Sequence, residues 1–254
     1  MKTSRSENLI LAAGAAGLAA LIALSAESWG QIPPPPPPIK KKTPAYAQIP
    51  PITGKGWKSL FDGKTLKGWK ITDFAGHGPV YVKDGKMILE MGAILTGVNG
   101  PTNLFKTNYE IVLDAMRVDG TDFFCGLTFP VGDSCCSLIV GGWGGGVVGI
   151  SSLDDLDASM NETTTFMNFE DDRWHRIRVC VTTERLQAWI GKQKVADVAI
   201  KGRRITVRPG EIELSQPFGI ATYQTTGAFR NIMWRPLSRE EAARINAQKP
   251  KKRF

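Results

Sequence analysis

Hydrophobic and polar residues alternate with a period of two through the middle of the chain, a pattern typical of β-strands that bury one face. The clearest example runs from Trp174 to Ile200. There Ile177, Val179 and Val181 fall on one face of a predicted strand, and polar side chains alternate with them. Two short turns divide this stretch, which therefore predicts three consecutive antiparallel strands.

Turn residues separate the other apolar runs. Lys83-Asp84-Gly85-Lys86 lies between two such runs, and Asp-Gly supplies the positive φ angles of a tight hairpin. Pro130-Val131-Gly132-Asp133 ends a strand predicted over residues 123–129. About a dozen short strands are expected in residues 57–237, with no long amphipathic helix. We therefore predict an all-β domain over residues 57–237, folded as a two-sheet antiparallel β-sandwich or jelly roll.

The first 30 residues have the order of an export signal. Lys2 and Arg5 precede an apolar run from Leu9 to Leu24, and small residues follow it. The run is shorter than the roughly 20 residues that a membrane span needs, so we expect cleavage after Gly30, or else after Ala26, with an uncleaved anchor as the alternative. The mature chain is then not membrane-spanning, and the expected location is the periplasm or the cell surface.

Two basic segments flank the predicted domain. Residues 31–56 hold six consecutive prolines, Pro33 to Pro38, followed by three lysines. Proline favours an extended polyproline II rod, so this segment is predicted to be a Pro-rich basic linker. It serves either as a solvated spacer or for electrostatic association with an anionic surface. Residues 238–254 form a basic C-terminal tail, which is expected to be solvated and poorly packed.

The positive charge of the chain lies in these flanking segments. The net charge is +8, and residues 1–56 and 238–254 each carry six basic and two acidic residues. The remaining 20 basic and 20 acidic residues balance within 57–237. A nucleic-acid-binding protein usually carries its positive charge on a folded face, so the composition argues against nucleic acid as a partner.

Three segments carry the signatures of one family. Ser59–Trp69 resembles its opening motif, Tyr81–Met87 one of its hairpins, and Phe218–Leu237 its closing strand pair with a Phe-Arg-Asn-Ile core. The family is the 3-keto-disaccharide hydrolase domain, found in exported proteins of planctomycetes and related bacteria. The resemblance spans about residues 57–237. It implies a concanavalin A-like fold and a carbohydrate-active domain that hydrolyses 3-keto-glycosides.

The chain departs from this family in two central strands. Residues 123–129 lack the Asn and Arg of the family's Asn-Ser-Gly-Ile-x-x-Arg strand, and residues 136–140 differ from its Tyr-Gln-Val segment. These strands lie where the family would bind its sugar. The alternative function is therefore a non-catalytic module for glycan binding or cell-surface interaction, and the sequence leaves both possibilities open.

Cleavage of a 3-keto-glycoside needs a base for the proton at C2, and glycosidases commonly use carboxylates. Glu162 follows a polar loop and is our candidate base, with Asp122 as the second candidate. Asp154 and Asp157 could supply oxygen ligands to a divalent cation such as Ca²⁺. Their spacing matches no calcium loop, so the cofactor stays undetermined.

Sugar binding commonly combines an aromatic ring with planar polar groups, and four residues are candidates for these roles. Trp143 lies among the five glycines of Gly141–Gly146, which predicts either an exposed stacking platform or a plug between strands. Trp189 and Arg178 lie on the polar faces of their predicted strands, and His77 lies in a glycine-containing loop. Carbohydrate is therefore the expected partner.

Overall fold

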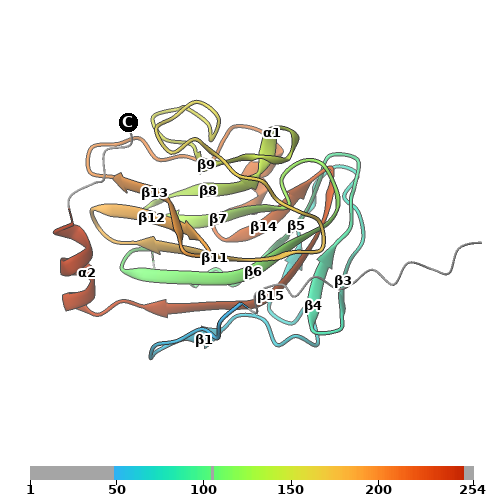
Figure 1. Ribbon diagram of the computed structural model, residues 1–254, viewed down its shortest axis with the longest axis horizontal. Coiled ribbons are helices and arrows are strands. Elements are labelled where there is room, and N and C mark those ends of the chain that lie inside the picture. Colours follow the sequence, from blue (N-terminus) through green and yellow to red (C-terminus); the bar gives the residue numbers. More distant parts are fainter. Residues whose placement is uncertain (1–48, 104–105, 249–254) are drawn as a thin grey trace, which may run out of the picture. The chain divides into compact units, whose positions relative to one another are not determined.

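The computed structural model describes residues 49–103 and 106–248. The predicted export signal and most of the Pro-rich linker lie outside the described residues. The described part is nearly all β-structure, in two antiparallel sheets that pack face to face (Figure 1). This confirms the predicted all-β sandwich.

The strands are more numerous than expected, and several are very short. Sheet I contains β1 (Lys58–Ser59), β3 (Val80–Lys83), β4 (Lys86–Leu89), β6 (Tyr109–Gly120), β11 (Trp174–Val181), β12 (Arg185–Ile190), β13 (Gln193–Ala199) and β15 (Thr225–Pro236). Sheet II contains β2 (Lys70–Ile71), β5 (Leu95–Asn99), β7 (Cys125–Val131), β8 (Ser134–Gly141), β9 (Val147–Ser151), β10 (Thr165–Phe166) and β14 (Gly219–Tyr223). The helical segments are α1 (Gly142–Gly145), the 3₁₀ turn η1 (Glu211–Ser215) and α2 (Arg239–Asn246).

The core lies between the two sheets because each strand turns alternate side chains inward. Sheet I has the order β13-β12-β11-β6-β15-β4-β3, and β1 also pairs with β15. Sheet II has the order β10-β9-β8-β7-β14-β5-β2. Ile177 and Leu113 meet as neighbours on sheet I, and Leu127 and Leu138 do so on sheet II. All four side chains are fully buried in the same apolar core.

The three strands predicted between Trp174 and Ile200 are confirmed as β11, β12 and β13. Ile177, Val179 and Val181 are fully buried on the inner face of β11. The Asp84-Gly85 hairpin also forms, joining β3 to β4 with both residues at positive φ. These elements were predictable because alternation and turn residues are local signals.

The C-terminal segment is better packed than the sequence suggested. Ser238 caps α2 by accepting the Glu241 N–H at 3.1 Å, and Ala242 on this helix is buried. Asn246, the last residue of the helix, accepts a hydrogen bond from Thr182 at 2.6 Å. The expectation of a poorly packed tail is therefore wrong as far as residue 248, because the capped helix docks on the outside of sheet I.

Buried ion pairs hold the outer face of sheet I together. The Asp114 side chain on β6 is 1% exposed, and it accepts hydrogen bonds from Arg176 on β11 at 2.5 and 3.2 Å. Asn231 on β15 donates to the same carboxylate at 2.7 Å. Asn231 has a φ of 52° and lies where the register of β15 shifts. Asn231, the third residue of the Phe-Arg-Asn-Ile motif, thus joins β15 to β6.

His175 predicts a pH dependence of stability. Its ring packs between Phe124 and Phe169, with centroids at 5.9 and 5.0 Å. Burial, reinforced by the charges of Arg173 and Arg117, lowers its pKa from 6.5 to about 4. Between these two pH values the unfolded chain binds a proton that the folded chain does not, so stability falls as the pH falls through this window.

The measurement is the urea midpoint of unfolding at several pH values between 7 and 4. We expect His175→Gln to lose less stability than the wild type over this interval, because its side chain does not titrate. His77→Gln is the matched control, since that side chain is exposed in a loop, and it should keep the wild-type slope. Equal slopes for the wild type and His175→Gln would contradict the assignment.

Candidate functional site

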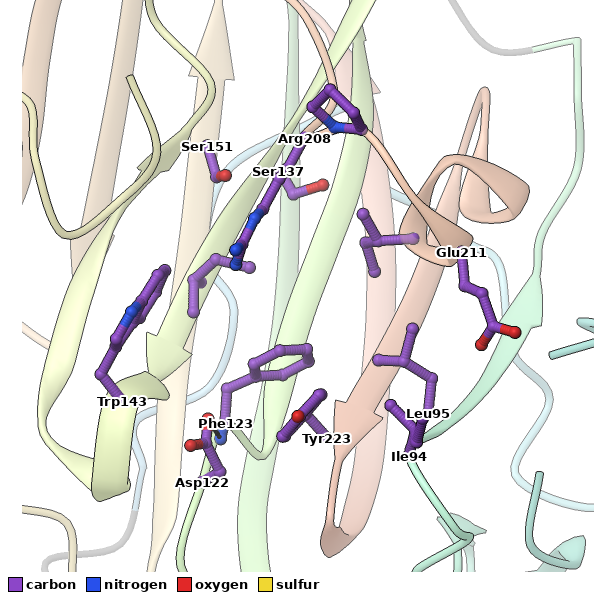
Figure 2. A pocket seen from close by; sticks show the side chains of 13 residues that line it. Ile94, Leu95, Asp122, Phe123, Ser137, Trp143, Ser151, Arg208, Glu211 and Tyr223 are labelled. Atoms are coloured by element: carbon purple, nitrogen blue, oxygen red, sulfur yellow. Dashed lines mark hydrogen bonds between the residues drawn. The ribbon is translucent and has the colours of Figure 1, made fainter. Parts of the chain in front are cut away.

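A cavity of about 440 Å³ opens on the outer face of sheet II, the face turned away from sheet I. Figure 2 shows the side chains that surround it. They come from strands of sheet II and from four connecting segments, those between β4 and β5, β6 and β7, β8 and β9, and β13 and β14. Its lining consists of Ile94, Leu95, Asp122, Phe123, Ser137, Ile139, Trp143, Ser151, Arg208, Pro209, Glu211, Ile212 and Tyr223.

Hydroxyl groups lie on the sheet face beneath this cavity. Ser137 on β8 is directly opposite Thr128 on β7 and Ser151 on β9 in the strand register. The Thr128 and Ser137 hydroxyls are hydrogen-bonded at 2.8 Å. Both serines are nearly fully buried yet line the cavity. The sheet thus presents a polar row that can orient a hydroxylated ligand.

The wall on one side is Trp143, and its backbone explains the surrounding glycines. Trp143 has a φ of 50°, and its neighbours Gly141, Gly144 and Gly145 also have positive φ angles. This left-handed path is costly for most residues and open to glycine. The loop leaves the Trp143 side chain 43% exposed beside the cavity, so the geometry favours the stacking platform over the plug.

Asp122 holds this loop in place. Its two carboxylate oxygens accept backbone N–H groups from Phe123 at 2.7 Å and from Gly144 at 3.1 Å. The second bond ties Asp122 to the residue that follows Trp143. The structure therefore brings together two of the residues predicted from sequence, with Asp122 fixing the loop that carries the ring.

The opposite wall was not predicted from the sequence. Arg208 and Glu211 lie in the segment that leads from sheet I back to sheet II, and both line the cavity. The Arg208 guanidinium lies 5.9 Å from the centre of the Trp143 ring, and Figure 2 shows it reaching across the site. The only local signal was Pro209-Gly210, which marks a loop, and loops often carry functional groups.

These groups give the cavity a defined chemistry. An aromatic face, a guanidinium, buried hydroxyls and two carboxylates surround one space. Such a mixture suits a ligand that has apolar C–H faces together with many hydroxyl groups. Glu211 can accept a proton, and Arg208 can stabilise a negatively charged oxygen.

Glu162 is not among the residues that line this cavity. Its carboxylate accepts a hydrogen bond from Arg203 at 2.5 Å, and Arg203 also pairs with Asp154 at 2.5 Å. The Arg203 hydrogen bond holds the pKa of Glu162 below its ordinary value. The polar loop before Glu162 favoured this residue as a base, but the sequence gives no indication of the arginine that binds it.

The two predicted cation ligands have other partners. Asp154 accepts the Arg204 N–H at 2.8 Å in addition to Arg203, and Asp157 accepts the Ser159 N–H at 2.9 Å. The neighbouring amide of Asn161 donates to three backbone carbonyls and fixes its loop. Within residues 49–103 and 106–248, no three His, Cys, Asp or Glu side chains gather in a metal-binding arrangement.

The other predicted binding residues lie apart from Trp143. Trp189 and Arg178 are on sheet I, where the guanidinium stacks 3.7 Å from the ring centre and also donates to Glu110. His77 lies in the loop before β3, with its Nδ1 atom 3.0 Å from the Gly78 carbonyl oxygen. None of the three lines the cavity on sheet II.

The described helices are all short, and none has the length and apolar character to cross a membrane.

In comparison with known families, a model of the 3-keto-alpha-glucoside-1,2-lyase-like domain matches residues 56–235. No curated protein matches the sequence.

Several solved structures are similar in fold. Domain 4 of AbnA, a GH43 extracellular arabinanase from Geobacillus stearothermophilus solved with arabinotriose, is 14% identical with a TM-score of 0.48, covering 75% of this chain and 97% of that domain. A proposed glycosyl hydrolase from Parabacteroides distasonis is 13% identical with a TM-score of 0.47, covering 72% and 94%. The carbohydrate-binding module CBM66 from Bacillus subtilis is 10% identical with a TM-score of 0.43, covering 66% and 95%.

Proposed function

The chain belongs to the family of 3-keto-alpha-glucoside-1,2-lyase-like domains, and from this premise we propose that its sheet II cavity binds and cleaves a glycoside oxidised at C3. One observation carries the proposal. Trp143, Arg208 and Glu211 surround a single cavity on the outer face of a β-sandwich. The ring and the Arg208 guanidinium would contact the sugar from one side, and Glu211 would reach it from the opposite rim of the cavity (Figure 2).

The chemistry follows from the keto group. A carbonyl at C3 acidifies the proton at C2, so Glu211 can remove this proton and leave an enolate whose oxygen Arg208 stabilises. The enolate electrons then form the C1–C2 double bond as the C1–O bond breaks, and the departing oxygen takes up a proton. Addition of water across this double bond completes a net hydrolysis.

A second candidate is glycan binding without cleavage. Both oxygens of Asp122 accept backbone N–H groups, so this carboxylate supports the Trp143 loop instead of facing the ligand as a free base. Glu211 is then the one remaining carboxylate in the cavity lining. A domain that keeps the Trp143 platform but has no effective base would bind a sugar and release no product.

Trp143→Ala tests the site common to both candidates. Binding of a 3-keto-α-glucoside, measured by calorimetry, should weaken by about tenfold, equivalent to about 1.4 kcal/mol, because the stacking surface is lost. Trp189→Ala is the matched control, since it removes a tryptophan from sheet I and should leave the affinity unchanged. The cavity is ruled out as the binding site if Trp189→Ala weakens binding and Trp143→Ala does not.

Product analysis in the same reaction distinguishes the two candidates. Release of the aglycone by the wild type supports the lyase-type cleavage. Binding without release supports the glycan-binding module. Absence of both binding and release would overturn the proposed function.

A further inference from the structure

Phe166 is the most exposed large hydrophobic side chain in the described part of the protein. It is 76% exposed and lies on β10, a strand of only two residues at the edge of sheet II. An aromatic ring in this position contributes little to the core. The ring is left exposed by folding, so its burial against a ligand would add a favourable hydrophobic contribution to the binding free energy.

The strand register places Phe166 on the same face as the cavity. Phe166 is opposite Val147 on β9. Val148 and Ile150 on that strand are in the core between the sheets, so Val147 and Ser151 belong to the outer face. Directly opposed residues of an antiparallel pair share a face, which puts Phe166 on the side where Ser151 lines the cavity.

The Trp143 loop connects the cavity to this edge. Gly142, which precedes Trp143, forms a bridge with Val147, and Val147 pairs with Phe166. The Met167 N–H also donates to the Gly146 carbonyl at 2.9 Å. Two interstrand spacings therefore separate Phe166 from Gly142 at the start of the loop, a distance of about 10 Å.

A second hollow follows the loop towards β10. It has a volume of about 350 Å³ and is lined by Gly144–Gly146, by Met167–Phe169 and by polar groups that include Arg117 and Asp171. Gly144 hydrogen-bonds to Asp122 of the first cavity. Trp143 thus borders the sheet II cavity, and the glycines that follow it border the second hollow.

We infer that Phe166 forms an outlying sugar subsite, so that the ligand of this domain is an oligosaccharide longer than a disaccharide. This inference rests on the proposed function, because it takes Trp143 as the central stacking surface. One sugar unit occupies the sheet II cavity, and the chain continues past the Trp143 loop to stack a further unit on Phe166. A second copy of this chain is the competing occupant of an exposed edge strand.

The test compares two ligand lengths in calorimetric titrations of the wild type, Phe166→Ala and Phe166→Trp. The ligands are maltose and maltotetraose, each oxidised at C3 of its non-reducing end. Phe166→Ala should bind the tetrasaccharide about fivefold more weakly and the disaccharide as the wild type does. Phe166→Trp should retain the tetrasaccharide affinity, since it keeps an aromatic face.

The control is Met160→Ala, which removes another exposed apolar side chain, 62% accessible, from the loop before β10. It should bind both ligands normally. An equal effect of Phe166→Ala on both lengths, or no effect on either, would overturn the subsite while leaving the Trp143 site intact. Failure of the wild type to bind either ligand would instead refute the proposed function and the subsite with it. A Phe166-dependent dimer in sedimentation would assign this edge to a second copy.

Discussion

Glu211→Gln is expected to lower cleavage of a 3-keto-α-glucoside by about 100-fold or more, the scale of a lost general base. Glu211 lies in the cavity lining together with Arg208. Glutamine keeps the size and polarity of the side chain but cannot accept the C2 proton. Affinity for the substrate should therefore change little while turnover falls, which steady-state kinetics and calorimetry measure separately.

Glu162→Gln is the matched control for this prediction. Glu162 belongs to an exposed ion-pair cluster with Arg203 and Asp154, and its substitution should leave turnover at the wild-type level. If Glu162→Gln abolishes cleavage and Glu211→Gln does not, the base is at the position favoured by the sequence pattern. The assignment of the cavity lining to catalysis would then be wrong.

Asp114→Ala should destabilise the fold by about 3 kcal/mol, the range observed when one partner of a buried ion pair is removed. The substitution leaves the Arg176 guanidinium, whose side chain is only 15% exposed, without its carboxylate. It also removes the acceptor for Asn231 at the register shift of β15. Urea denaturation of the purified domain measures the loss as a lower unfolding midpoint.

Asp133→Ala is the comparison for this change. Asp133 pairs with Lys106, but their side chains are 98% and 66% exposed, so solvent screens the interaction. We expect no measurable shift of the unfolding midpoint. A comparable loss of stability in both variants would show that burial of the Asp114 pair does not determine its contribution.

Local patterns in the sequence were sufficient to predict the fold. The alternation in β11 identified the buried residues Ile177 and Val179, and Asp84-Gly85 identified a hairpin. The positive φ of Asn231 and the associated register shift had no such signal. At this point Asn231 makes a long-range hydrogen bond to Asp114, 117 residues earlier in the chain, and such a contact leaves no local pattern in the sequence.

The same distinction applies to the candidate site. Trp143 was identifiable because five glycines around one aromatic residue are unusual locally, and Asp122 because it directly precedes the strand predicted over residues 123–129. Arg208 and Glu211 join them only through a connection between the two sheets, which sequence spacing does not reveal. Glu162 was misleading for the converse reason, since an isolated acid in a polar loop gives no indication of its Arg203 partner.

The most direct test of the central claim is a titration of the tryptophan indole N–H resonances with a 3-keto-α-glucoside, observed by NMR. Single substitutions such as Trp143→Phe assign the signals. A sugar in the sheet II cavity should shift the Trp143 signal and leave Trp174 and Trp189 of sheet I unchanged. Shifts confined to Trp174 or Trp189, with Trp143 unaffected, would place the sugar on the other sheet and contradict the account.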